Sequence, residues 1–329
     1  MKSYDHVLGF ALSHPWNLET GMLSLIAGVL ARRIAGLEVD QAAIEAALVN
    51  RKNLPQPRAG SVAIIPVYGV LAPRMNLMSD MSGGTTYDKL TGQLRAAVAD
   101  KTVKTIVLDI DSPGGSVAGN AELATEVMKA RAKKPVIAQI QFTGASAAYQ
   151  IAAAATEIVA APSAMIGSVG TYWMHRDLSE ALKQLGVKET YLSAGEGKVD
   201  GNSSGPMSAE FEARMQATID AAFGSFVSNV VKGRGQGMTA ERVKKDWKAH
   251  VYIAPAALAN GMIDSIATLD DTLARLLTAS PDAADQRAAL DFASTDATDQ
   301  EPLAATSQER QAEIAWQNAT DRALLELDI

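Results

Sequence analysis

The chain has 329 residues, of which 47% are hydrophobic and 20% charged, a composition typical of a soluble globular protein with a sizeable core. It has no cysteine, which excludes disulfides and thiolate catalysis, and its four histidines are not at metal-ligand spacing, so no metal or other cofactor is expected. The net charge is −7, but residues 281–329 hold eleven acidic residues against three arginines, a net of −8. The preceding 280 residues therefore carry about +1 and offer no basic stripe for nucleic acid.

Residues 1–58 are predicted to form a helical N-terminal extension, because apolar residues recur at helical spacing within 20–35 and 39–49. The apolar run 22–30 is too short to span a bilayer. Two arginines follow this run rather than precede it, so it is a poor export signal. We therefore expect neither a membrane span nor secretion.

Residues 59–278 are predicted to form an α/β domain, because apolar strands alternate with helices and imply parallel βαβ units. The run TIVLDI at 105–110 is nearly all apolar, as in strands buried on both faces of a sheet. The expected strands are 62–70, 105–110, 135–141, 157–160 and 188–192, and the expected helices are 85–99, 119–132, 145–155, 207–232 and 239–250.

Residues 279–329 are predicted to be a flexible acidic linker and tail. Residues 280–307 are rich in Ala, Asp, Thr and Gln without periodicity, and only 308–327 regain a weak helical spacing.

Three segments of the α/β domain contain residues suited to catalysis. The first, Asp111-Ser112-Pro113-Gly114-Gly115-Ser116, follows a predicted buried strand and precedes a predicted helix. Its two glycines let the backbone approach a ligand closely with amides available as donors. A tight strand–helix turn from Asp111 to Gly115 is the structural alternative.

The second segment, Thr143-Gly144-Ala145-Ser146-Ala147-Ala148-Tyr149, also lies between a strand and a helix. Small neighbours leave room for a substrate carbonyl, and the amide of Ala147 at the helix start is a free donor. The structural alternative is that Ser146 only caps the helix, in which case Ser146→Ala costs about 1 kcal/mol of stability.

The third segment, residues 193–201, places Lys198 among three glycines. A lysine in such a loop is usually a solvated side chain. A lysine in a crowded site that excludes water can instead accept a proton, and it can serve a nucleophilic serine as general base.

Together the three segments resemble the serine peptidases of the signal peptide peptidase A family, also called protease IV. The resemblance runs from about Val62 to Leu269 and includes MIGSVG at 165–170 and Gly-Met-Ile-Asp at 261–264. It implies an α/β core of the Clp/crotonase type, built from repeated ββα units. The chain departs from the family at Ala147-Ala148, where glycines are frequent, and at Ile253-Ala254-Pro255, where Thr-Gly-Arg is frequent.

The resemblance implies that Ser146 is the nucleophile and Lys198 the general base of a serine endopeptidase. It implies an oxyanion hole made by the backbone amides of Gly114 or Gly115 and of Ala147. The related Clp proteases use a histidine after a Met-Ile pair, but here Met165-Ile166 is followed by Gly167, and we interpret His175 as structural. The resemblance also implies a homo-oligomer in which a neighbouring subunit can supply the lysine.

The acidic tail and the lack of a membrane anchor are typical of the phage branch of this family, the capsid (prohead) proteases, which cleave scaffold and capsid proteins. This predicts capsid or scaffold proteins as partners, a scaffold-like tail, and a location in the host cytoplasm or the prohead. The alternatives are a bacterial signal-peptide-peptidase-like protease that degrades small or membrane-derived peptides, an acyl-CoA enzyme of the crotonase type, and a non-catalytic assembly protein.

Overall fold

The computed structural model describes residues 16–18, 58–74, 84–235 and 237–278. The chain divides into one compact unit of residues 1–280 and another of residues 281–329, and every described residue lies in the first. The predicted acidic tail and most of the predicted helical extension therefore lie outside the described residues. Residues 16–18, within that extension, form a strand instead of a helix.

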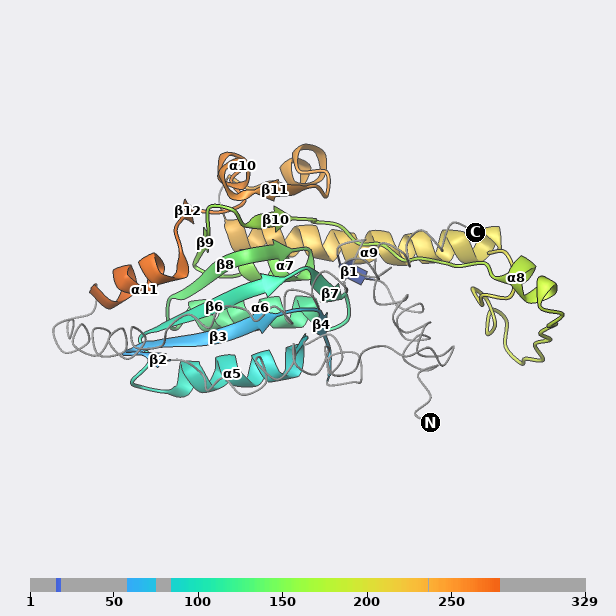
Figure 1. Ribbon diagram of the computed structural model, residues 1–329, viewed down its shortest axis with the longest axis horizontal. Helices are drawn as coiled ribbons and strands as arrows, with labels where there is room; N and C mark the ends of the chain where they lie inside the picture. Colours follow the sequence, from blue (N-terminus) through green and yellow to red (C-terminus); the bar gives the residue numbers. More distant parts are fainter. Residues whose placement is uncertain (1–15, 19–57, 75–83, 236, 279–329) are drawn as a thin grey trace, which may run out of the picture. The chain divides into compact units, whose positions relative to one another are not determined.

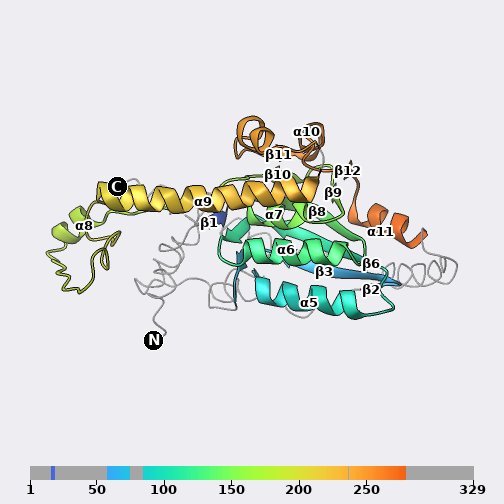
Figure 2. The same ribbon diagram turned by 180° about the vertical axis from the view of Figure 1, so that it is seen from behind.

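The core is an eight-stranded sheet whose central strands are parallel (Figures 1 and 2). Its main path runs β11-β10-β8-β6-β3-β2, and β9 pairs with both β8 and β12. The strand bounds are β2 Arg58–Ala59, β3 Val62–Tyr68, β6 Thr105–Ser112, β8 Val136–Ala145, β9 Glu157–Ala160, β10 Met165–Gly167, β11 Val251–Ile253 and β12 Ser265–Ile266.

A four-stranded second sheet, in the order β1-β7-β4-β5, lies beside the carboxyl ends of β3 and β6 (Figure 1). It consists of β1 Trp16–Leu18, β4 Leu71–Ala72, β5 Thr85–Thr86 and β7 Gly114–Ser116. Strand β6 thus belongs to the large sheet, the next strand β7 belongs to the small sheet, and a helix comes next in the chain. The predicted α/β core with ββα units is confirmed.

The helices are α5 Tyr87–Ala99, α6 Asn120–Arg131, α7 Ala147–Ala153, α8 Ser179–Gln184, α9 Ala209–Arg234, α10 Ala254–Ala259 and α11 Leu269–Thr278, with a π-helix η1 at Arg242–Asp246. The side chain of Thr86 caps α5 through the amide of Lys89, and Ser208 caps α9 through the amide of Phe211. Both caps satisfy amides that have no acceptor within their helices.

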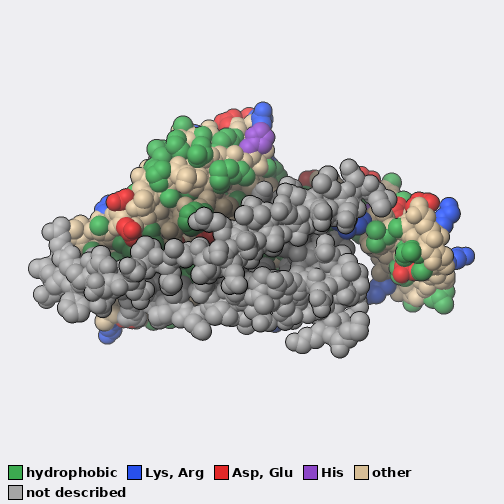
Figure 3. Space-filling view, in the orientation of Figure 1, with side chains coloured by type: hydrophobic (Ala, Val, Ile, Leu, Met, Phe, Trp, Pro, Cys, Tyr) green, Lys and Arg blue, Asp and Glu red, His purple; other side chains and the backbone are tan. Residues whose placement is uncertain are grey.

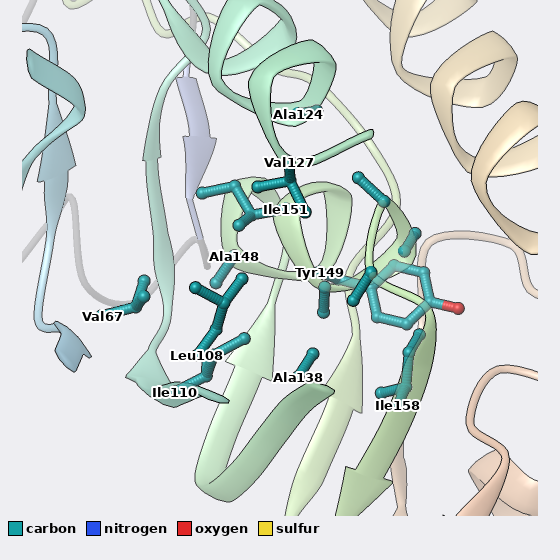
Figure 4. Packing of buried hydrophobic residues seen from close by; sticks show 14 of the residues in the cluster. Val67, Leu108, Ile110, Ala124, Val127, Ala138, Ala148, Tyr149, Ile151 and Ile158 are labelled. Atoms are coloured by element: carbon teal, nitrogen blue, oxygen red, sulfur yellow. The ribbon is translucent and has the colours of Figure 1, made fainter. Parts of the chain in front are cut away.

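Apolar layers cover both faces of the large sheet. On one face α5, α6, α7 and α9 pack on Ile106, Leu108 and Ile110 of β6. On the other, Leu277 of α11 joins Val107. Figure 4 shows Ala148 and Ile151 of α7 between Leu108 of β6 and Val127 of α6. Strand β6 is therefore buried on both faces, as its apolar run predicted.

Three local predictions were wrong. Residues 111–115 are not a turn: β6 continues to Ser112, and β7 begins at Gly114 because it finds strand partners in β1 and β4. Residues 188–192 form no strand, and the side chains of Glu189 and Tyr191 bond to the hydroxyl of Ser204. The helix predicted at 239–250 is shorter in the structure, where residues 240–246 are helical and most of them form the π-helix η1.

Candidate active site

Ser146 lies at the junction between β8 and α7 in a strained conformation. Its φ is 54° and its ψ is −118°, a combination that favours glycine, and its side chain is fully buried. It occupies the N-cap position of α7, but its hydroxyl makes no capping bond. Within the described part of the chain, its Oγ has no hydrogen-bond partner. The capping alternative therefore does not explain this serine. Backbone strain of about 1–3 kcal/mol and an unbonded buried hydroxyl are typical of a functional position.

Backbone contacts and buried side chains hold Ser146 in place. Its N–H donates to the carbonyl of Gly167 at 2.7 Å, and its own carbonyl accepts from Gln150 at 3.0 Å. Every residue of α7 is buried, and the hydroxyl of Tyr149 donates to the carbonyl of Met262 at 2.8 Å. The Gly-Met-Ile-Asp segment at 261–264 thus anchors the helix that carries the nucleophile candidate.

Strand β7 brings the two glycines of the first segment beside this junction. Ser112 donates from Oγ to the carbonyl of Gly69 at 2.6 Å and accepts from the amide of Gly114 at 3.2 Å. A Cβ on Gly115 would lie 2.0 Å from the carbonyl oxygen of Leu71 in β4. Gly114 has a φ of 108°. Both positions therefore require glycine, one for its backbone angle and one for a close approach.

Two links connect the elements that flank β7 to the segment that carries Ser146. The registers of β6 and β8 shift near Ile110, so that Ser112 pairs with Gly144, two residues before Ser146. Asn120 at the start of α6 donates from Nδ2 to Oε1 of Gln150 in α7 at 2.6 Å, and both side chains are buried. Ser112, Gln150 and Gly167 were not assigned a role from sequence, although Ser112 lies in the glycine-rich segment 111–116 and Gly167 in the family-like stretch 165–170.

The three predicted oxyanion amides differ in their surroundings. Ala147 is the first residue of α7, so its N–H has no acceptor within the helix. The N–H of Gly114 donates to Ser112. Gly115 pairs with Asn17 of β1.

Lys198 lies on a separate arm, the exposed segment of residues 178–206, and its side chain is exposed. The loop around it is tied to α9: Arg214 bonds to Asp200 at 2.6 Å, and a Cβ on Gly201 would lie 2.3 Å from the ring of Phe211. These contacts restrict a loop whose glycines alone predicted little stiffness.

The structure does not bring Ser146 and Lys198 together. The arm contacts α9 at Phe211, whereas α9 reaches α7 near Gly233, where a Cβ would lie 2.0 Å from the carbonyl oxygen of Ala153. Roughly 33 Å of helix separates Phe211 from Gly233 at about 1.5 Å per residue. Figures 1 and 2 both show α8 at the N-terminal end of α9.

His175 supports the arm. Its ring stacks on Trp173, with centroids 6.0 Å apart, and its Nε2 lies 3.2 Å from the carbonyl oxygen of Gly205. Across the described ranges, no cluster of three or more His, Asp or Glu side chains could hold a metal ion. The helices in those ranges include none long and apolar enough to cross a membrane.

Comparison with known proteins defines the class of this site. Residues 128–280, which include Ser146 and Lys198, match Peptidase family S49. The chain therefore carries a Peptidase S49 domain, which confirms the family expected from its motifs.

Curated relatives include both phage and bacterial proteins. Head-tail preconnector protein GP5 of Enterobacteria phage P21 is 34% identical over 66% of this chain and 43% of that protein. Protease 4 of Salmonella typhi is 32% identical over 67% of this chain and 35% of that protein. Capsid assembly protease C of Escherichia phage lambda is 31% identical over 64% of this chain and 48% of that protein. The chain spans less than half the length of each of these relatives.

Proposed function

We propose that the protein is a serine endopeptidase in which Ser146 is the nucleophile. The observation that carries this proposal is the strained, buried Ser146 with an unbonded hydroxyl, held at a strand–helix junction beside the glycine-rich β7. A helix-capping or purely structural serine has no need of that geometry. The match to Peptidase family S49 supports the same chemistry.

In the proposed reaction, Ser146 Oγ attacks the carbonyl carbon of the scissile peptide bond while its proton passes to the neutral amine of Lys198. The oxyanion then accepts hydrogen bonds from the amide of Ala147 and from an amide of β7. Lys198 returns the proton to the leaving amine, and water hydrolyses the acyl-enzyme by the same steps. The amide of Ser146 takes no part, because it donates to Gly167. The amide of Gly114 donates to Ser112 and Gly115 pairs with Asn17, so either β7 amide has to leave its present partner to bind the oxyanion.

We further propose that Lys198 acts on Ser146 of a neighbouring subunit. The arm is attached far from the junction of its own chain, and α8 has no buried residue. The arm exposes large apolar side chains (Leu185 by 77% and Leu192 by 96%), interspersed with charged ones (Figure 3). A partner surface that covers these side chains would also exclude water from Lys198, which disfavours its charged form.

A role in capsid maturation fits the chain best, with scaffold or capsid proteins as substrates in the host cytoplasm or prohead. Its support is the similarity to GP5 and to Capsid assembly protease C. The similarity to Protease 4 keeps a signal-peptide-peptidase-like role as the second candidate.

Labelling with a fluorophosphonate probe tests the proposed function. The probe forms a phosphonyl ester with an activated serine and releases fluoride. We expect a single modified residue, Ser146, in the wild type and none in Ser146→Ala. Modification elsewhere, or equal labelling of Ser146→Ala, contradicts the assignment and favours a non-catalytic assembly protein or a crotonase-type enzyme.

A further inference from the structure

The N-terminal strand β1 is inserted between two segments of the site. On one side it pairs antiparallel with β7, with Trp16 opposite Ser116 and Leu18 opposite Gly114. On the other side Trp16 and Tyr172 exchange both backbone hydrogen bonds, at 2.9 and 3.1 Å. An extended segment from the N-terminal part of the chain thus fills a slot between strand β7 and the isolated bridge residue Tyr172, and Trp16 is 1% exposed.

The pairing register shows which backbone groups the strand occupies. Because the polar groups of Trp16 face Tyr172, those of the next residue, Asn17, face Gly115 on the opposite side. Asn17 and Gly115 therefore form a hydrogen-bonded pair, and the amide of Gly115 is engaged by β1. This amide is a predicted oxyanion donor.

The same two segments flank Ser146. One leads from Ser112, which pairs with Gly144, into β7. The other leads from Gly167, which pairs with Ala145 and accepts the amide of Ser146, toward Tyr172. Strand β1 bridges these two segments, and Ser146, from which both lead, is fully buried.

We propose that the slot between β7 and Tyr172 binds extended peptide, and that β1 is a self-ligand which must leave before a substrate strand can enter. The groove recognises the backbone by strand pairing and accepts a large aromatic side chain at the position of Trp16. This inference rests on the proposed function, because it takes Ser146 to be the nucleophile next to the groove.

A reversible crosslink between β1 and β7 tests the inference. Trp16 and Ser116 form a non-hydrogen-bonded pair, for which Cα atoms lie about 4.5 Å apart, within the range for a disulfide of about 4.4–6.8 Å. Because the chain has no cysteine, Trp16→Cys/Ser116→Cys introduces one defined pair. Oxidised and reduced forms of this one protein are compared, each single-cysteine variant serving as control.

The first readout is the binding of a fluorescent peptide that has the sequence of residues 12–22, which is measured by fluorescence anisotropy. We expect binding to the reduced form and loss of binding in the oxidised form. The second readout, fluorophosphonate labelling of Ser146, should be lost on oxidation and return on reduction. Equal peptide binding by both forms overturns the inference. Peptide binding needs no nucleophile, so an unlabelled Ser146 together with redox-dependent binding contradicts only the proposed function.

A second pair of variants needs no disulfide. Asn17→Pro removes the N–H that pairs with Gly115, whereas Asn17→Ala keeps it. With both proteins folded by circular dichroism, Asn17→Pro should bind the peptide more tightly than Asn17→Ala and the wild type. Unchanged or weaker binding by Asn17→Pro means that β1 supports the site rather than blocks it.

Discussion

At the residue scale, Ser146 combines a glycine-like backbone with a buried hydroxyl that lacks a partner in the described structure. Both features cost stability, and neither contributes to packing. Such a position is expected where function is retained at the expense of folding free energy.

Ser146→Ala should therefore abolish peptidase activity and raise the free energy of unfolding by about 1 kcal/mol, because it removes an unsatisfied buried polar group. This is opposite in sign to the loss expected of a helix cap. Denaturant unfolding measures it. Ser146→Gly, which also suits the positive φ, should be at least as stable as the wild type, and a clear destabilisation of both variants would show that the hydroxyl has a stabilising partner.

The bond between Asn120 and Gln150 is the second feature at this scale. Asn120→Ala leaves the buried Gln150 without its donor and should cost about 1–3 kcal/mol. Because this bond holds α6, which follows β7 in the chain, against α7, we expect a larger fall in kcat than rise in KM on a peptide substrate. Lys129→Ala, on the exposed face of α6, is the control. If the variant loses stability while kcat is unchanged, the bond between Asn120 and Gln150 contributes to folding and has no part in catalysis.

At the element scale, the salt bridge between Arg234 and Asp264 joins the end of α9 to the segment before β12. The guanidinium bonds both carboxylate oxygens, at 2.7 and 2.9 Å, and Ile158 donates its amide to the same carboxylate. Burial opposes ionisation of Asp264, but these hydrogen bonds outweigh it and hold the pKa of Asp264 below its usual value.

A lowered carboxylate pKa contributes stability that is present above the unfolded pKa of about 3.9 and is lost as pH falls through the folded value. Asp264→Asn should therefore be less stable than the wild type at pH 7, and the difference should shrink below about pH 4. Thermal unfolding across pH measures it, with the exposed Asp246→Asn as control. A difference independent of pH would assign the loss to the geometry of the bonds rather than to charge.

The local sequence predicted those helices and strands whose packing partners are close in the chain or whose hydrophobic pattern is strong. The apolar run of β6 and the small-residue segment of α7 were predicted because their composition reports burial directly. The segment Gly114–Ser116 resembles a turn in isolation and becomes a strand by pairing with Leu71 of β4 and with Trp16–Leu18, the latter about a hundred residues earlier. Glycines at 114 and 115 were recognised, but the carbonyl of Leu71 that makes one of them obligatory cannot be inferred from nearby residues.

At the scale of the whole molecule, the proposed pair of Ser146 and Lys198 is not assembled within one chain, because Lys198 is held on the arm away from Ser146. We expect a homo-oligomer whose specific activity rises with protein concentration as subunits associate. Sedimentation and activity measured over the same concentration series check this. Full activity of a monomer contradicts it.

Mixing Ser146→Ala subunits with Lys198→Ala subunits should restore activity that neither variant has alone, since some interfaces then combine an intact serine with an intact lysine. Lys183→Ala, a lysine elsewhere on the arm, should remain active on its own and serves as the control. If native mass spectrometry shows exchanged subunits and the mixture stays inactive, both groups act within one chain.

Strand β1 belongs to the same polypeptide as the groove it fills, so the groove experiences it at an effective concentration, typically of millimolar order for a tethered ligand. A free peptide with equal contacts would have to approach that concentration to compete. Dilute proteins in the surrounding solution would then not displace the strand and would not be cleaved, whereas substrates packed densely around the enzyme would displace it. Crowding of the substrate would itself serve as the signal that starts cleavage.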